Sequence, residues 1–128
     1  MRYLLDSHVL LWYTLGEAQL SGTASRLILD AANEILISPA SYWEIAIKVS
    51  IGKLALHQPY EDFVDACLNR YGFTILPITP KHTNALTTML FHHKDPFDRL
   101  LVAQALVEEI PIVSIDVILD KYGIKRIW

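Results

Sequence analysis

The stretch DPFDRLLVAQA, residues 95–105, decides the fold, because two acids open a helix that is otherwise almost wholly apolar. Asp95 before Pro96 predicts the helix start, since aspartate caps helices well and proline suits the first turn. Asp98 follows in that turn, where the positive end of the helix dipole favours a carboxylate. Capping accounts for both positions, yet it leaves Asp98 free to point at a ligand while Asp95 holds the helix end.

Short apolar runs and amphipathic segments alternate on both sides of this helix. The expected strands are residues 2–5, 35–37, 73–76, 112–115 and 124–127. The other expected helices are residues 8–15, 24–32, 38–49, 59–68 and 80–90, with a helical turn at 117–122. Strands separated by helices imply a mainly parallel sheet that is covered on both faces, and therefore an α/β fold. A chain of 128 residues fits a single domain, residues 1–128.

The composition excludes several classes of protein. No apolar run is long enough to cross a membrane, and no signal peptide is recognisable, so we expect no membrane partner. The single Cys67 fits a helical core position, and one cysteine cannot form an internal disulfide, which favours the cytoplasm. The five histidines lack zinc-site spacing, and no phosphate-binding glycine loop is present.

Three more acids stand where apolar segments begin or end. Asp6 follows the first strand, Asp116 follows the fourth, and Glu44 lies within an apolar helix. Ligands of open α/β sheets bind beyond the carboxyl ends of parallel strands, so these acids can meet Asp98 there. Such a carboxylate pocket is typical of Mg²⁺ or Mn²⁺ sites. The alternatives are turns for the two aspartates and an ion pair of Glu44 with Lys48, one helical turn on.

Four quoted stretches, in this order, resemble the PIN-domain family, and most closely its VapC-type toxin ribonucleases. They are LLDSH (4–8), SPASYWEIAIK (38–48) with GKL (52–54), HKDPFDRLLVAQA (93–105), and SID (114–116) with YG (122–123) and the closing IW (127–128). The resemblance implies a three-layer α/β/α sandwich, a homodimer, and inhibition by a small antitoxin protein.

The resemblance also implies roles for particular residues. The catalytic quartet would be Asp6, Glu44, Asp98 and Asp116. Of these, Asp6, Asp98 and Asp116 would lie nearest one or two Mg²⁺ or Mn²⁺ ions, and Glu44 would complete the site or orient the water. Supporting contacts would come from Ser7, Asp95 and Ser114.

The reaction implied is metal-dependent hydrolysis of RNA. A divalent cation would neutralise the acids and activate a water for attack on phosphorus. The candidates for holding RNA phosphates are Lys48, Lys53, Arg99 and the loop 92–94, which we expect to be exposed and basic. For each cation, solvated surface charge or an ion pair is an equally good explanation.

Two other classes of protein are alternatives to a nuclease. A phosphoacceptor receiver module also gathers acids at one edge of a parallel sheet, but it needs its acceptor on a middle strand, and Asp6 follows the first strand in sequence. A PIN-like module that binds RNA or protein without cutting would lack one of the acids, and all four are present.

Overall fold

A computed structural model describes residues 1–128 and contains one five-stranded parallel sheet. The strands are β1 (Arg2–Leu5), β2 (Glu34–Ile37), β3 (Thr74–Ile75), β4 (Ile112–Val113) and β5 (Arg126–Ile127). Their order across the sheet is β3-β2-β1-β4-β5, and every neighbouring pair is parallel. The predicted α/β fold class is therefore confirmed. β1 is the central strand although it comes first in the sequence.

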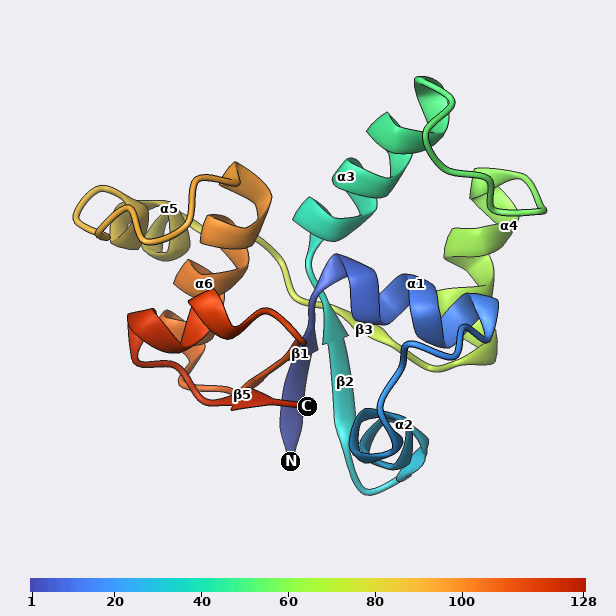
Figure 1. Ribbon diagram of the computed structural model, residues 1–128, viewed down its shortest axis with the longest axis horizontal. Coiled ribbons are helices and arrows are strands. Elements are labelled where there is room, and N and C mark those ends of the chain that lie inside the picture. The colour runs from blue at the N-terminus through green and yellow to red at the C-terminus, as the bar shows by residue number, and fades with distance from the viewer.

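Helices connect the strands and cover both faces of the sheet (Figure 1). The helices are α1 (Ser7–Leu15), α2 (Gly22–Leu29), α3 (Pro39–Ser50), α4 (Tyr60–Asp65), α5 (Pro80–Leu86) and α6 (Pro96–Glu108). A π-helical turn, η1 (Ala66–Arg70), extends α4, and a 3₁₀-helix, η2 (Val117–Tyr122), follows β4. No helix is both long and apolar enough to span a membrane.

Alternating strand residues supply two separate apolar cores. Leu5, Ile35, Ile37 and Val113 face the layer of α1 to α4, where Cys67 is also fully buried, as its sequence context predicted. The intervening residues face α6 and η2 on the other side of the sheet, and they are Leu4, Leu36 and Ile112. Apolar side chains on both faces are typical of a sheet buried between two helical layers, and together they give the predicted three-layer sandwich.

The fifth helix ends earlier than predicted, at Leu86 instead of residue 90. Both the backbone N–H and the hydroxyl of Thr87 bond to the carbonyl of Asn84, which closes the last turn. Beyond it, the Arg99 guanidinium donates to the Leu90 carbonyl at 2.8 Å. The β-branched Thr87 and the contact of Arg99 with Leu90 thus take the place of the backbone hydrogen bonds that would have continued the helix to residue 90.

Candidate active site

The first acid of the site is placed by the pairing of the two middle strands. Leu5 of β1 is in register with Val113 of β4, and the Asp6 backbone N–H continues the ladder to the Val113 carbonyl at 3.2 Å. The Asp6 carboxylate also caps α1, accepting from the Val9 N–H at 2.8 Å. Asp6 is therefore buried at the carboxyl edge of the sheet, by which we mean the edge formed by the carboxyl ends of the strands.

The segment after β4 brings a second acid beside it. The buried Ser114 hydroxyl hydrogen-bonds to the Asp6 carboxylate and accepts the Asp116 backbone N–H at 3.0 Å. Asp116 in turn caps η2 by accepting from the Ile118 N–H at 3.0 Å. One hydroxyl thus links the two strand ends.

The third acid comes from the start of α6. Asp95 caps this helix, as predicted, because its Oδ1 accepts from the N–H groups of Phe97 and Asp98, at 2.8 and 3.2 Å. Since Asp95 supplies the cap, the Asp98 carboxylate is free to face the other acids. Trp43 of α3 packs edge-on against Phe97, with ring centroids 5.3 Å apart, which helps to fix this end of α6.

Three carboxylates therefore border one hollow of about 360 Å³, which we call the acidic hollow. Its lining residues are Asp6, His8, Trp12, Asp98, Ile115 and Asp116. Burial, together with the charges of Asp95, Glu44 and Asp6, raises the pKa of Asp98 to about 7, against the opposing effect of His93. Burial, with a contribution from Asp116, also raises the pKa of Asp6 above its usual range. The acids thus repel one another and resist full ionisation.

His93 is the functional candidate that the sequence did not reveal. Its Nε2 lies 2.9 Å from Asp116 Oδ2 and 3.2 Å from Asp98 Oδ2. On the far side of the ring, Nδ1 accepts the Asp95 backbone N–H at 3.1 Å, so in the neutral imidazole the proton is assigned to Nε2. The Tyr122 hydroxyl accepts the His93 backbone N–H at 2.8 Å. His93 is thus oriented to donate to both carboxylates.

The prediction that loop 92–94 is an exposed basic loop is wrong for His93. Only 16% of the His93 side chain is exposed, because the ring fills the gap between two acids. His92 and Lys94 are exposed, as expected. The only signal in the sequence was the position of His93, two residues before a capping aspartate. No helical or strand period could show that its ring turns back over the start of α6.

Glu44 lies outside the acidic hollow. It is buried on α3 and pairs with Lys48, with Lys48 Nζ 2.9 Å from Glu44 Oε2, which is the ion pair that its spacing allowed. Its charge still reaches the site, because it raises the pKa of Asp98. Of the predicted quartet, the structure brings Asp6, Asp98 and Asp116 together and holds Glu44 behind them.

The remaining predicted residues have different surroundings. The Ser7 hydroxyl donates to that of Ser41 at 3.0 Å and so joins α1 to α3 in the core. Lys53 is exposed and makes no ion pair. Arg99 is buried, with its guanidinium 3.9 Å from the centroid of the Phe91 ring and bonded to backbone carbonyls. A contact between Arg99 and RNA stays a prediction from the sequence alone.

The donor set of the acidic hollow suits a hard divalent cation. Asp98, Asp116 and His93 each offer one atom, and these atoms lie within 4.8 Å of one another. The proton on Nε2 makes His93 a hydrogen-bond donor there, which leaves carboxylate oxygens as the ligands. Carboxylate oxygens gathered around one space are the ligands that Mg²⁺ and Mn²⁺ prefer. The geometry therefore fits the predicted cation.

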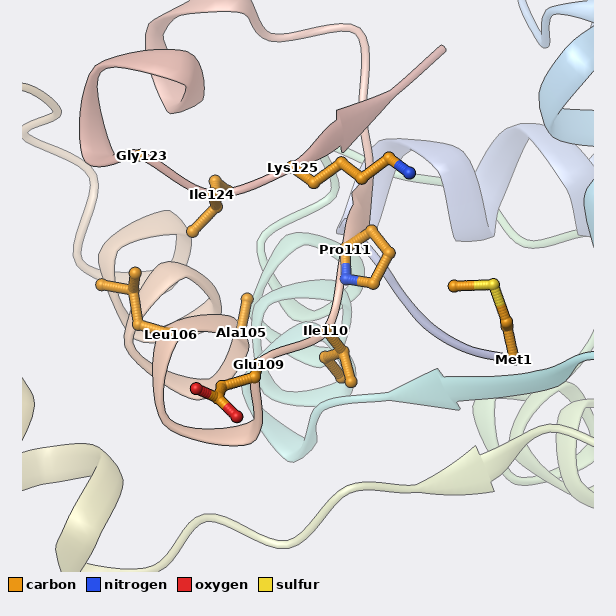
Figure 2. Close-up of a pocket in the computed structure, with 9 residues that line it drawn as sticks. All are labelled: Met1, Ala105, Leu106, Glu109, Ile110, Pro111, Gly123, Ile124 and Lys125. Atoms are coloured by element: carbon orange, nitrogen blue, oxygen red, sulfur yellow. The ribbon is translucent and has the colours of Figure 1, made fainter.

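A second hollow, of about 450 Å³, lies at the opposite, amino edge of the sheet (Figure 2). Met1, Pro111 and Lys125 border it just before three of the strands begin. Its two charged side chains, Glu109 and Lys125, extend away from each other. This hollow gathers no set of ligands and no pair of titratable groups in contact.

The sequence as a whole matches a known family. A family model for the PIN domain matches residues 3–125. The chain belongs to the PIN-domain family. This membership confirms the resemblance seen in the four stretches of sequence.

Several proteins similar to this chain carry VapC or VapBC names. Ribonuclease VapC16 of Mycobacterium tuberculosis is 39% identical over 57 residues, which cover 44% of this chain and 40% of that relative. VapBC2 from Rickettsia felis, solved with a DNA fragment from its promoter, superposes with a TM-score of 0.70 at 16% identity, covering 99% of this chain and 98% of that one. VapC20 of M. tuberculosis, described as a toxin that cleaves the sarcin-ricin loop, gives 0.61 at 17% identity, covering 95% of each chain. At these identities, the solved structures show the shared fold.

Proposed function

We propose that this chain is a metal-dependent endoribonuclease, the toxin of a toxin–antitoxin pair, with residues 1–128 as one PIN domain. The observation that carries the proposal is the acidic hollow, where Asp6, Asp98 and Asp116 from three separate elements border one space. A capping role would not require their convergence. The ribonuclease name of the partly aligned relative supports RNA as the substrate.

The acids would hold one or two Mg²⁺ or Mn²⁺ ions. When bound, such a cation supplies positive charge that neutralises the acids, polarises the phosphodiester and makes a water molecule more acidic. Asp6, Asp98 and Asp116 offer the oxygen atoms for this purpose. Because the pKa of Asp98 is about 7 without a cation, binding would also displace the proton that this carboxyl group otherwise carries near neutral pH.

Neighbouring side chains would orient those carboxylates. The Ser114 hydroxyl holds Asp6, and His93 Nε2–H donates to Asp98 and Asp116. Such outer hydrogen bonds fix ligand orientation in metal sites. Glu44, paired with Lys48, adds negative potential next to Asp98 and so favours binding of a cation there.

RNA would reach the acids past two lysines. Lys48 and Lys53 border a third hollow, which shares His8 and Trp12 with the acidic one. Phosphates attracted to these lysines would lie close to the carboxylates without facing them directly. The proposed function thus separates the groups that hold the RNA from those that hold the cation.

Two protein partners belong to the same proposal. Solved relatives of the VapBC type support a small antitoxin as one of them. The other is a second copy of the chain, because Trp43 and Ile47 of α3 and Ile51, which caps its C-terminal end, are spaced as an exposed apolar stripe. Light scattering should report a dimer, and Ile51→Asp should shift it toward monomer. An RNA-cleaving toxin of this kind would act in the cytoplasm.

The central test is cleavage of a mixed RNA pool with Mg²⁺, Mn²⁺ or a chelator, with the ends mapped by sequencing. The wild-type protein should cut with either cation and not with the chelator. Asp98→Asn should lower the cleavage rate by roughly 10²-fold or more, because it removes a charge from the site of the cation.

Asp62→Asn is the matched control, since Asp62 is exposed on α4 far from the hollow. It should cut like the wild type. Equal cleavage by purified Asp6→Asn and Asp98→Asn would refute the assignment. Retention of RNA by the wild type without cleavage would instead favour a binding module.

A further inference from the structure

Two aromatic side chains of α1 border both the acidic hollow and its neighbour. His8 and Trp12 are one helical turn apart and therefore lie on the same face of α1, with ring centroids 5.7 Å apart and a tilt of 44°. Both line the acidic hollow, and both line the adjacent hollow of about 440 Å³ that contains Lys48 and Lys53. We call the space that contains the two lysines the lysine hollow.

The Trp12 ring is held in place from behind. The Trp128 ring packs edge-on against it, with centroids 5.7 Å apart and an angle of 60° between the planes. Trp12 is half-buried, while His8 is exposed. A large aromatic surface is thus fixed beside the acids although the apolar core does not enclose it. Packing alone would not require a tryptophan at a border between two hollows.

The charges around these rings change sign over a short distance. The acidic hollow carries three carboxylates, whereas the lysine hollow carries Lys48 and Lys53 against the single carboxylate of Glu17. Lys48 is engaged by Glu44, so Lys53 is the cation left without an ion pair. A phosphate is therefore favoured at the lysine side, and a divalent cation at the acid side. The aromatic rings lie between them.

We propose that Trp12, with His8, is a stacking platform for one nucleobase of single-stranded RNA, next to a phosphate held by Lys53. Single-stranded RNA is bound through bases that stack on aromatic side chains and through phosphates that contact lysine or arginine. On the rim of the lysine hollow, Gln19 and Glu17 offer an amide and a carboxylate to the edge of that base. This inference rests on the proposed ribonuclease function and adds a binding subsite for the base nearest the cut.

The test is a binding cycle between one side chain and one base. Fluorescence anisotropy would follow a labelled single-stranded oligoribonucleotide of mixed sequence, either intact or with one abasic residue placed at each position in turn. The Asp98→Asn protein is the parent, because we expect it to cleave far more slowly and it lowers the negative charge facing the RNA. One abasic position should weaken binding to the parent by roughly 5- to 100-fold, the usual range for a stacked base.

In the Trp12→Ala variant, the abasic residue at that position should not weaken binding further. Trp12→Phe should restore the difference in affinity between the intact and the abasic oligonucleotide, because it keeps an aromatic face. Lys53→Ala should weaken binding of all these oligonucleotides by the same factor. Lys81 is an exposed lysine of α5, and Lys81→Ala should leave binding unchanged. Circular dichroism would check folding, and if Trp12→Ala unfolds, Trp12→Leu replaces it.

An abasic effect that persists in Trp12→Ala, or in the Trp12→Leu replacement, would overturn the inference, and so would failure of the parent to bind RNA. Loss of antitoxin binding in Trp12→Ala with unchanged RNA binding would assign the rings to the partner protein instead. The proposed function fails separately, if the wild-type protein cuts no RNA. Evidence for a stacked base in a protein that cuts no RNA would support the stacking platform and refute the proposed ribonuclease activity.

Discussion

The carboxyl and amino edges of the sheet each carry a hollow of similar volume, about 360 and 450 Å³, but their chemistry differs. At the carboxyl edge, three acids converge and His93 bridges two of them. At the amino edge, Glu109 and Lys125 extend apart from a mainly apolar wall (Figure 2). The hollow at the amino edge is therefore the larger of the two but the less suited to a reaction.

The direction of the chain explains this asymmetry. In a parallel sheet every strand ends at the same edge, and the helix that follows often begins there with a capping side chain. Asp6 and Asp116 both cap the helix that follows their strand, and Asp95 frees Asp98 by capping α6 in its place. These capping carboxylates lie near the positive ends of helices, which stabilise negative charge. The carboxyl edge can therefore gather acids at little cost to the stability of the fold. The amino edge has no such source of ligands.

The largest expected difference between the two edges is stabilisation by a cation. Mg²⁺ or Mn²⁺ should raise the free energy of unfolding by about 2.7 kcal/mol at 100 times its Kd, because only the folded protein gathers the acids. Thermal unfolding at increasing cation concentration would measure this. Asp98→Asn should lose most of the effect, whereas Glu109→Gln, at the amino edge, should keep it. Equal stabilisation of both variants would place the cation elsewhere.

The second expected difference is a pH dependence confined to the carboxyl edge. The pKa of Asp98 in the folded protein is about 7, well above its ordinary value of 3.8, so between these values the folded state binds a proton that the unfolded state lacks. Lowering the pH through this window therefore stabilises the metal-free protein. Because 26% of the Asp98 side chain is exposed, we expect only about 1–2 kcal/mol more stability near pH 5.5 than near pH 8.

Urea unfolding in the presence of a chelator, at both pH values, would test this dependence. Asp98→Asn should flatten it and be the more stable protein at the higher pH. Glu109→Gln should follow the wild type. A wild-type stability that rises with pH across this window, and equally in Asp98→Asn, would show that the carboxyl group of Asp98 is ionised throughout.

The third difference concerns His93, which has no counterpart at the amino edge. His93→Ala removes the N–H donor between Asp98 and Asp116, and we expect it to lower the free energy of unfolding by about 1 kcal/mol without a cation. A saturating cation should reduce that loss, since it neutralises the same two carboxylates. His93→Gln, which keeps an N–H donor, should lose less. A loss that is the same with and without the cation would reduce His93 to a packing role.

The sequence predicted the convergence of Asp6, Asp98 and Asp116 because strand ends and helix caps follow local rules. It also offered the Glu44–Lys48 ion pair, which depends only on helical spacing. These features could be predicted since each needs the chain direction and one secondary structure element. The family membership confirms the α/β fold to which those local rules led.

Features that depend on spatial order were not predictable. Strand order makes β1 central, so Asp6 does follow a middle strand, and its position does not count against a receiver module. The family match excludes that module instead. His93 belongs to a loop, where no periodicity places a ring, and its position depends on the Asp95 N–H and the Tyr122 hydroxyl, 29 residues away.

The smallest expected effects are those of substitutions at the amino edge. Glu109→Gln and Lys125→Ala alter side chains at the rim of the larger hollow, where neither forms an ion pair. Surface changes of this kind shift the free energy of unfolding by about 0.5 kcal/mol or less, and cleavage should stay within about twofold of the wild type. Urea unfolding and the RNA-pool assay would measure both. A large loss of cleavage in either variant, with stability unchanged, would mean that the amino edge takes part in the reaction. The gathering of acids at one edge would then no longer identify which edge is the active site.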